Sequence, residues 1–272
     1  MDIVRPAFVP DPSLSTPEME SLQRDIAEAA VFDDDHGVDM DTVEMDGPAA
    51  QATLGEDGPD SPDTEGMPLV AGVDQAFVGE QAVSAVVLLR GREVVERVSA
   101  VEPVEIPYVP GLLAFREGGP VLSALSALDR EPDVVLVDGS GRIHYREAGL
   151  ATHVGVALDV PTVGVAKNLL CGTPGASLDR KLATGERVPI RADDEVETAP
   201  AGTRIGHAVQ TRQYESGSRH INPLIVSPGH RVSAATAADL VLATAAGYKL
   251  PEPTRLADDY AATAKVDLSP EE

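Results

Sequence analysis

The sequence predicts an α/β protein with a mixed β-sheet and helices on both faces. Three strand-like runs come first, at residues 69–77, 82–90 and 93–101, and short turns join them. This spacing is typical of an antiparallel meander. Helical and strand-like runs then alternate as far as residue 230, which favours a mixed sheet with covering helices. With 43% hydrophobic residues in 272, the chain can bury a sizeable core.

Composition divides the chain into four parts. Residues 1–32 form an N-terminal segment with one amphipathic helix. Residues 33–66 are acidic and rich in Gly and Pro, which is typical of a solvated loop or linker without its own core. Residues 67–264 carry the regular apolar patterns and form the expected main domain. Residues 265–272 form an acidic tail.

Local patterns predict the elements after the first three strands. A Pro-rich stretch precedes a helix expected near residues 119–130, and "DVVLVDG" at 133–139 is typical of a buried strand. Ser233 can cap an Ala-rich helix. The remaining expected elements are helices at 147–159, 233–246 and 254–264 and strands at 161–167, 187–190, 203–212 and 222–230.

The net charge is −24 and is unevenly distributed. Residues 1–68 carry 18 of the 45 acidic residues but only 2 of the 21 basic ones, and only 4 of those basic residues are Lys. An acid-rich, Lys-poor composition indicates a salt-adapted protein, in which salt screens self-repulsion. Strong acidity disfavours nucleic-acid binding, but the less acidic main domain retains local arginines.

Several classes of protein are disfavoured. No apolar run approaches the length of a membrane span, and the N-terminus lacks the pattern of a signal peptide. The single cysteine, Cys171, fits a reducing cytoplasm. We expect a cytoplasmic monomer without a membrane partner. A nucleophilic role for Ser140 or Cys171 is weakly indicated, because the G-x-S-x-G pattern and an adjacent base are missing.

Two acids lie in equivalent contexts. Asp74 lies late in the run "LVAGVDQAF", and Asp138 ends "DVVLVDG". A carboxylate in an apolar strand is costly unless it is paired or bound to a metal. Two such acids on neighbouring strands could share Mg²⁺, which prefers oxygen ligands. A turn-forming role is the alternative for Asp138, because Gly139 follows it.

Three further side chains could complete such a site. Glu117 is either a third acid or a residue that favours a helix start. Lys167 ends the strand-like run "PTVGVAK", where it can hold a phosphate or stabilise a leaving oxygen, unless it is a surface lysine. His230 precedes the Ala-rich helix and could orient water or a metal ligand, with a structural role as the alternative.

Five stretches in order resemble the endonuclease V family. They are "GVDQAF", "YVPGLLAFREGGPVL", "DGSGRIHYREAGLATHVG", "GVAKNLL" and "SPGHRVS" with "YKLPEPTRLA". The match is collinear across residues 67–258. The resemblance implies a ribonuclease H-like fold, whose mixed five-stranded sheet has three antiparallel strands first.

The resemblance also implies a function. It is that of a DNA-repair endonuclease that depends on Mg²⁺, for which Mn²⁺ could substitute. Its partner would be DNA containing deoxyinosine, and it would nick the second phosphodiester bond on the 3′ side of the lesion. An inosine-specific ribonuclease acting on RNA and a catalytically silent nucleic-acid-binding protein are the alternatives.

Residue roles follow from the resemblance position by position. Asp74 and Asp138 match the metal-binding acids, and Glu117 matches the third catalytic carboxylate. Lys167 matches the lysine near the scissile phosphate, and His230 matches a catalytic histidine at the edge of the metal site.

The resemblance also assigns residues to DNA recognition. The wedge that enters the duplex comprises Tyr108, Val109, Pro110 and Gly111. The expected walls of the base pocket are Gly111, Leu113, Gly139 and Gly164. Supporting roles fall to His144, Arg116 and Arg146.

Overall fold

The computed structural model describes residues 1–43, 45, 47–49, 66–216 and 219–268. Its strands are β1 (Leu69–Val78), β2 (Gln81–Arg90), β3 (Glu93–Pro103), β4 (Val134–Asp138), β5 (Thr162–Ala166), β6 (Thr173–Pro174), β7 (Arg187–Arg191), β8 (Arg204–Val209) and β9 (Leu224–His230). Its α-helices are α1 (Thr16–Ala29), α2 (Leu113–Ser126), α3 (Leu150–Leu158), α4 (Ala234–Ala243) and α5 (Glu252–Leu268). None of these helices is long and apolar enough to cross a membrane.

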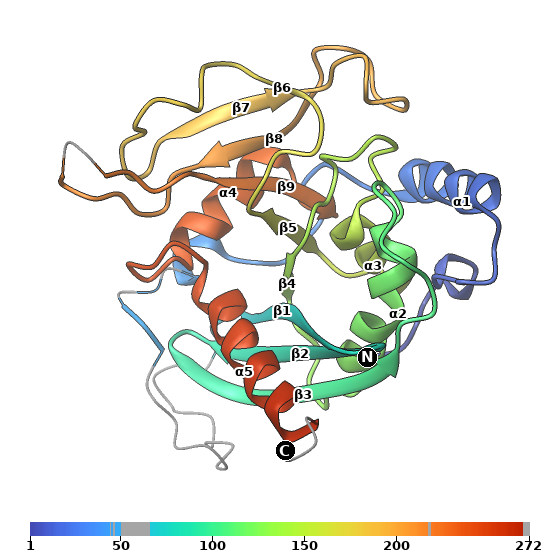
Figure 1. Ribbon diagram of the computed structural model, residues 1–272. Coiled ribbons are helices and arrows are strands. Elements are labelled where there is room, and N and C mark those ends of the chain that lie inside the picture. The colour runs from blue at the N-terminus through green and yellow to red at the C-terminus, as the bar shows by residue number, and fades with distance from the viewer. Residues whose placement is uncertain (44, 46, 50–65, 217–218, 269–272) are drawn as a thin grey trace.

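One mixed sheet organises the molecule (Figure 1). Within the described residues it has nine strands, in the order β3-β2-β1-β4-β5-β9-β8-β7-β6. The first three strands are antiparallel, as predicted, and β1, β4 and β5 are parallel to one another. The expected five-stranded sheet is too small, because β9 pairs with the outer edge of β5 and three further strands extend the sheet from there.

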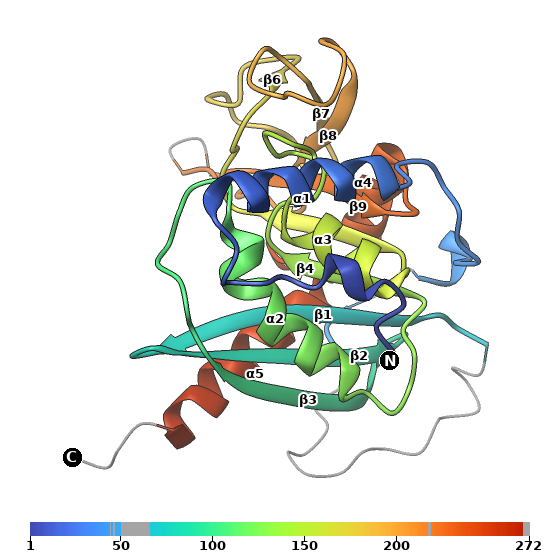
Figure 2. The ribbon, with the colours of Figure 1, turned by 90° about the vertical axis from the view of Figure 1, so that its right-hand side faces the viewer.

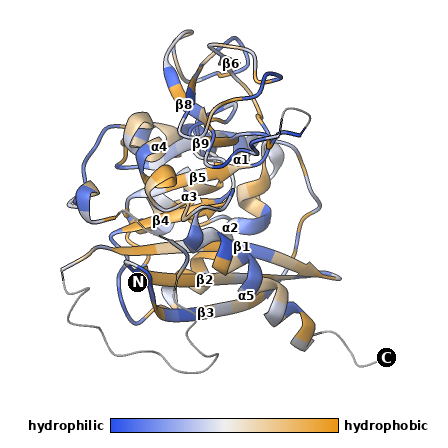
Figure 3. Cartoon of the chain, turned by 90° about the vertical axis from the view of Figure 1, so that its left-hand side faces the viewer, coloured by the Kyte–Doolittle hydropathy of each residue, from blue (hydrophilic) through white to orange (hydrophobic). Residues whose placement is uncertain are grey.

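Helices cover both faces of the sheet, as the sequence predicts. Helices α2 and α3 pack on one face and α4 and α5 on the other, while α1 lies outside α3 (Figures 1 and 2). Adjacent residues of β1, Val70 and Ala71, belong to opposite cores, because side chains alternate along a strand. Strands β4 and β5 are buried on both faces and are mainly hydrophobic (Figure 3).

Helix α2 begins earlier than the predicted residues 119–130. It starts at Leu113, and Pro120 lies inside it. A Gly-Gly-Pro sequence favours a helix break, but tertiary packing outweighs this local preference. The first turns bury Ala114 and Phe115, and a Cβ on Gly118 would lie 2.7 Å from the side chain of Pro10.

Part of the acidic segment 33–66 packs on the domain instead of extending as a free loop. Val43 and Met45 are buried in the core. Asp34 accepts hydrogen bonds from the Ser233 backbone N–H at 2.7 Å and from the Thr236 hydroxyl at 2.9 Å. These carboxylate contacts help to cap α4. The expected loop residues 44, 46 and 50–65 and the tail residues 269–272 lie outside the described residues.

Helix α5 approaches β1 at Gly72. A Cβ on Gly72 would lie 2.0 Å from the carbonyl carbon of Pro253, at the start of α5. Any side chain there would therefore displace the helix. Gly72 and Asp74 lie on the same face of β1, because they are two residues apart. The contact consequently sets the position of α5 relative to Asp74.

We expect Gly72→Ala to lower the free energy of unfolding by about 1–3 kcal/mol, because the added methyl group overpacks the contact with Pro253. Urea unfolding at high salt measures the effect. Gly37→Ala is the matched control, because a Cβ there would meet nothing within 4 Å. Equal stability of the two variants would show that α5 is not held by this close approach.

Candidate active site

Two carboxylates meet at one edge of the sheet. In the parallel pair of β1 and β4, Val73 lies beside Val137. The next residues, Asp74 and Asp138, are therefore neighbours. The carboxyl ends of parallel strands are where α/β proteins commonly place their functional groups. Both acids are half-buried, and the predicted pairing of these two residues is present in the structure.

Asp74 lies in an environment that disfavours its charge. Burial raises the pKa of Asp74 to about 8, and the charge of Asp138 and contacts with Asp258 of α5 add to the rise. Asp74 also accepts a hydrogen bond from the backbone N–H of Gln75 at 2.8 Å, which partly opposes the rise. A cation bound here would relieve the repulsion among these carboxylates.

Glu117 lies close enough to this group to sense its charge. Burial raises the pKa of Glu117 to about 7, against the opposing charge of Arg116, and Asp138 adds to the rise. Its backbone carbonyl accepts a hydrogen bond from the side chain of Gln75 at 2.9 Å. This bond ties α2 to β1, so the helix that carries Glu117 is fixed to the strand that carries Asp74.

Lys167 supplies a positive charge directly after β5. Its Nζ donates a hydrogen bond to Oδ2 of Asp138 at 2.9 Å, and its side chain is 54% exposed. Burial lowers the pKa of Lys167, but the hydrogen bond and the charges of Asp138, Asp74 and Asp258 outweigh this and raise it. The ammonium group therefore stays charged and remains open to a phosphate from solvent.

The donor set fits a hard divalent cation. Asp74, Asp138 and Asp258 offer carboxylate oxygens, and the surroundings of Asp74 disfavour its charged form unless a cation is bound. Over the described ranges, no three His, Cys, Asp or Glu side chains converge as a complete metal cluster. Such a partial set suits Mg²⁺, which takes one or two protein carboxylates and completes its coordination with water and substrate phosphates.

Sequence reasoning missed Asp258. It lies in α5, a helix predicted to be short, and another acid, Asp259, follows it. Nothing in this local pattern separates a functional acid from a solvated one. Only the packing of α5 on Gly72 brings Asp258 to Asp74.

A pocket of about 320 Å³ opens beside the carboxylates. Asp138 and Lys167 line it, so it is continuous with the candidate metal site. The residues predicted for recognition that also line it are Tyr108, Gly111, Leu113, Gly139 and His144. The structure thus brings together residues that the sequence assigns to chemistry and to base recognition.

Gly164 is not a wall of this pocket. It lies beneath the turn at residues 139–141, where a Cβ on Gly164 would be 2.3 Å from the backbone nitrogen of Gly141. Its expected role in the base pocket is therefore wrong. The absence of a side chain lets the turn rest directly on β5, which indirectly shapes the pocket.

The expected wedge lies between β3 and α2, with Tyr108 64% exposed and Val109 37% exposed. Arg116 supports this segment by donating a hydrogen bond from NH1 to the carbonyl of Ile106 at 2.7 Å. Its guanidinium also lies 5.1 Å from the ring centre of Phe77. Arg116, for which a supporting role is predicted, therefore contacts the wedge segment.

His144 and Arg146 face the protein. His144 is 4% exposed, and its Nε2 lies 3.0 Å from the Gly111 carbonyl oxygen. Arg146 is 6% exposed and donates from NH1 to Glu197 at 2.9 Å and from Nε to Gln23 at 2.8 Å. Protein acceptors therefore occupy the Arg146 guanidinium, so it supports local structure and not a phosphate.

His230 lies toward the opposite edge of the sheet from the carboxylates. Strand β9 is antiparallel to β5, so His230 pairs with Thr162 at the beginning of β5, whereas Asp138 pairs with Val165 near its end. Three residues of strand separate these positions by about 10 Å. The expected place of His230 at the edge of the metal site is therefore wrong, because the sequence does not reveal the direction of β9.

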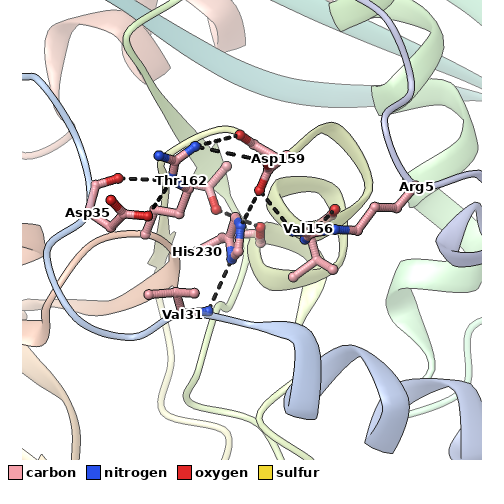
Figure 4. A network of polar contacts seen from close by, with 9 residues as sticks. Arg5, Val31, Asp35, Val156, Asp159, Thr162 and His230 are labelled. Atoms are coloured by element: carbon pink, nitrogen blue, oxygen red, sulfur yellow. Dashed lines mark hydrogen bonds and ion pairs between the residues drawn. The ribbon is translucent and has the colours of Figure 1, made fainter.

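A polar network holds His230 instead (Figure 4). The side chain is fully buried, and its Nε2 lies 3.0 Å from Oδ1 of Asp159. Its Nδ1 accepts a hydrogen bond from the backbone N–H of Val31 at 3.1 Å. Arg5 and Arg231 also contact Asp159. The network joins the N-terminal segment to the sheet.

The alternative nucleophiles are inactive in this setting. Burial raises the pKa of the Cys171 thiol to about 12, and nearby acids add to the rise. The hydroxyl of Ser140 donates to the carbonyl of Ile143. Neither group is an activated nucleophile.

The paired carboxylates, the lysine and the adjoining pocket together fit the chemistry of a metal-dependent nuclease. The chain belongs to the endonuclease V family, because the sequence profile of Endonuclease V matches residues 56–259. It is therefore a nuclease of a metal-dependent family, and the alternative of a catalytically silent protein is wrong.

Two similar proteins come from halophilic archaea. Endonuclease V from Haloarcula marismortui is 66% identical, over 97% of this chain and 98% of its own length. Endonuclease V from Halobacterium salinarum is 58% identical, over 96% of this chain and 99% of its own length. The prediction of a salt-adapted protein from its composition is confirmed by these relatives.

Solved structures share the fold. Endonuclease V from Streptomyces avermitilis has a TM-score of 0.71 and 30% identity, covering 98% of this chain and 99% of its own. Endonuclease V from Ciona intestinalis, at 24% identity, has a TM-score of 0.67 and covers 93% of this chain and 98% of its own. The latter was solved in complex with a 24mer DNA containing an inosine followed by a ribo-adenosine.

Cation binding should release a proton near neutral pH. Asp74, with a pKa of about 8 in the metal-free protein, must lose its proton to bind Mg²⁺. The apparent Mg²⁺ affinity should rise by up to about tenfold per pH unit below this pKa and level off above it. Calorimetry in buffers of different ionisation enthalpy measures both quantities. A pH-independent affinity would contradict the assigned environment of Asp74.

His230→Gln should leave Mg²⁺ affinity unchanged, because His230 lies away from the carboxylates. It should lower the free energy of unfolding by about 1–3 kcal/mol, because buried hydrogen bonds to Asp159 and Val31 are disturbed. Asp74→Asn, in contrast, should abolish measurable Mg²⁺ binding. Calorimetry measures the Mg²⁺ affinity and urea unfolding measures the stability. A comparable loss of Mg²⁺ affinity in both variants would show that His230 does belong to the metal site.

Proposed function

We propose that this nuclease is a Mg²⁺-dependent DNA-repair endonuclease that recognises deoxyinosine and hydrolyses the second phosphodiester bond on its 3′ side. The observation that carries the proposal is the continuity of the pocket with the carboxylate site, since Asp138 and Lys167 belong to both. The family resemblance supplies the lesion and the position of the nick. The inosine-containing DNA bound by the Ciona relative supports the same substrate.

The carboxylates of Asp74 and Asp138 would hold the cation, with Asp258 beside them. Bound Mg²⁺ would supply Lewis acidity at the scissile phosphate, and Mn²⁺ offers similar chemistry. Lys167 would place its ammonium against the phosphate and neutralise developing negative charge. Glu117, with a pKa of about 7, can accept a proton from the attacking water near neutral pH.

Lesion recognition would use the pocket and the exposed wedge. A base must leave the stack to be read, and a mispaired base costs least to extrude. Exposed Tyr108 can fill the gap that the base leaves in the duplex. Gly111 and Gly139 line the pocket, where the Gly111 N–H and the Gly139 carbonyl would pair with the carbonyl oxygen and the ring N–H of hypoxanthine, two groups that adenine lacks.

We also propose a ribonuclease H-like core, a monomeric state and a cytoplasmic location. The strand order β3-β2-β1-β4-β5, with three antiparallel strands first, supports a ribonuclease H-like core to which β6–β9 are added. In this account the nuclease works as a monomer in the cytoplasm, in keeping with its single buried cysteine.

A nicking assay tests the proposal at high KCl concentration with Mg²⁺. End-labelled duplexes with one deoxyinosine should give a single product, whose length places the nick at the second bond 3′ to the lesion. Asp138→Asn should lower kcat by at least about 100-fold, because both cation binding and the Lys167 contact are altered. Asp34→Asn, which changes an acid at α4, is the matched control.

Two results would contradict the proposal. Efficient cleavage of inosine-containing RNA with no nicking of inosine-containing DNA would assign the alternative ribonuclease function. Cleavage of DNA without any preference for inosine would remove lesion recognition altogether.

A further inference from the structure

The exposed Tyr108 lies in a segment that belongs to no helix or strand. Residues 104–112 join β3 to α2 without a regular helix or strand. The chain turns into α2 at Gly111, whose φ of +79° is in the left-handed region that favours glycine. A wedge that separates bases must hold one conformation. The polar contacts of this segment therefore matter for recognition.

Two buried donors converge on the carbonyl oxygen of Gly111. Gln23 Nε2 donates to it at 2.8 Å, and His144 Nε2 lies 3.0 Å from it. Burial lowers the pKa of His144 to about 4, with Arg146 adding to this effect, so the ring is neutral at physiological pH. Its Nδ1 accepts the Arg146 backbone N–H at 3.2 Å, which leaves Nε2 as the donor to Gly111.

The orientation of the Gln23 amide is fixed. Its Oε1 accepts a hydrogen bond from Nε of Arg146 at 2.8 Å, so its NH₂ group faces Gly111. The side chain is completely buried. Arg146 is held in turn by Glu197 at 2.9 Å. A glutamate at position 23 would keep the acceptor for Arg146 but would place an acceptor against the Gly111 carbonyl.

Gln23 comes from α1, a helix tied to the main domain at both ends. Before α1, Arg5 contacts Asp159 at 3.0 Å. After α1, the Val31 N–H binds His230, which itself contacts Asp159 (Figure 4). Both flanks of the helix thus converge on one buried network. Ile26 also packs against α3, so α1 holds Gln23 at a defined position.

We propose that Gln23 is a positioning residue for lesion recognition, which holds the Gly111 carbonyl and thereby sets the conformation of the wedge segment. The inference rests on the proposed function and names a residue beyond the recognition motifs. Its consequence is specific to duplex substrates. A wedge must part a duplex, whereas an inosine in a single strand needs no wedge to reach the pocket.

The kinetic test compares inosine in duplex and in single-stranded DNA. Gln23→Glu should lower kcat/KM on the duplex by about tenfold, the effect of one buried hydrogen bond. It should change kcat/KM on the single strand by less than about twofold. Arg24→Gln is the control, because it alters the next residue of α1 and only a half-exposed ion pair with Glu197. Equal losses on both substrates, or no loss on the duplex, would overturn the inference.

Hydrogen–deuterium exchange of the free proteins gives a readout that does not depend on any substrate. Amide exchange over residues 104–112 should increase in Gln23→Glu, stay unchanged in Arg24→Gln, and remain slow in β4 in both. Unchanged exchange in this segment would overturn the positioning role. If the variants show this exchange pattern but the wild-type enzyme does not prefer inosine, the positioning role stands and the proposed function is contradicted.

Discussion

The structure depends on a repulsion between carboxylates that is built into the strand register. Parallel pairing of β1 with β4 places Asp74 beside Asp138, and α5 adds Asp258. Asp74 and Asp138 are half-buried, so water alone cannot fully stabilise their charges. Lys167 offsets part of the negative charge. A divalent cation would neutralise the rest and would give the anionic phosphate of a substrate a positive partner, which links metal binding to substrate binding.

The remaining architecture holds this charged edge and the recognition segment in fixed relation. Gly72 lets α5 approach β1 closely enough for Asp258 to reach Asp74. Gln75 ties the helix of Glu117 to the same strand. On the far side, the network around His230 secures α1, which in turn contacts the wedge segment. Residues distant from the chemistry therefore influence where the substrate would lie.

Much of this arrangement could be predicted from the sequence, because local patterns determine it. The apolar run that contains Asp74 and the one that ends at Asp138 indicated both the strands and their functional edge. Interactions between distant parts of the chain were not predictable in the same way. His230 was expected beside the metal site because the sequence does not reveal that β9 runs antiparallel to β5. Helix α2 continues through a Gly-Gly-Pro sequence that locally favours a break, because its packing stabilises the helix. Asp258 reaches Asp74 only because α5 packs closely on Gly72.

The neighbouring carboxylates of β1 and β4 are proposed to form the cation site. Crystals soaked in Mn²⁺ test it most directly, because anomalous scattering locates the ion. We expect an anomalous peak between Asp74 and Asp138, next to the pocket that Asp138 and Lys167 line. A peak confined to the acidic residues around Asp34, with none beside Asp74, would contradict it.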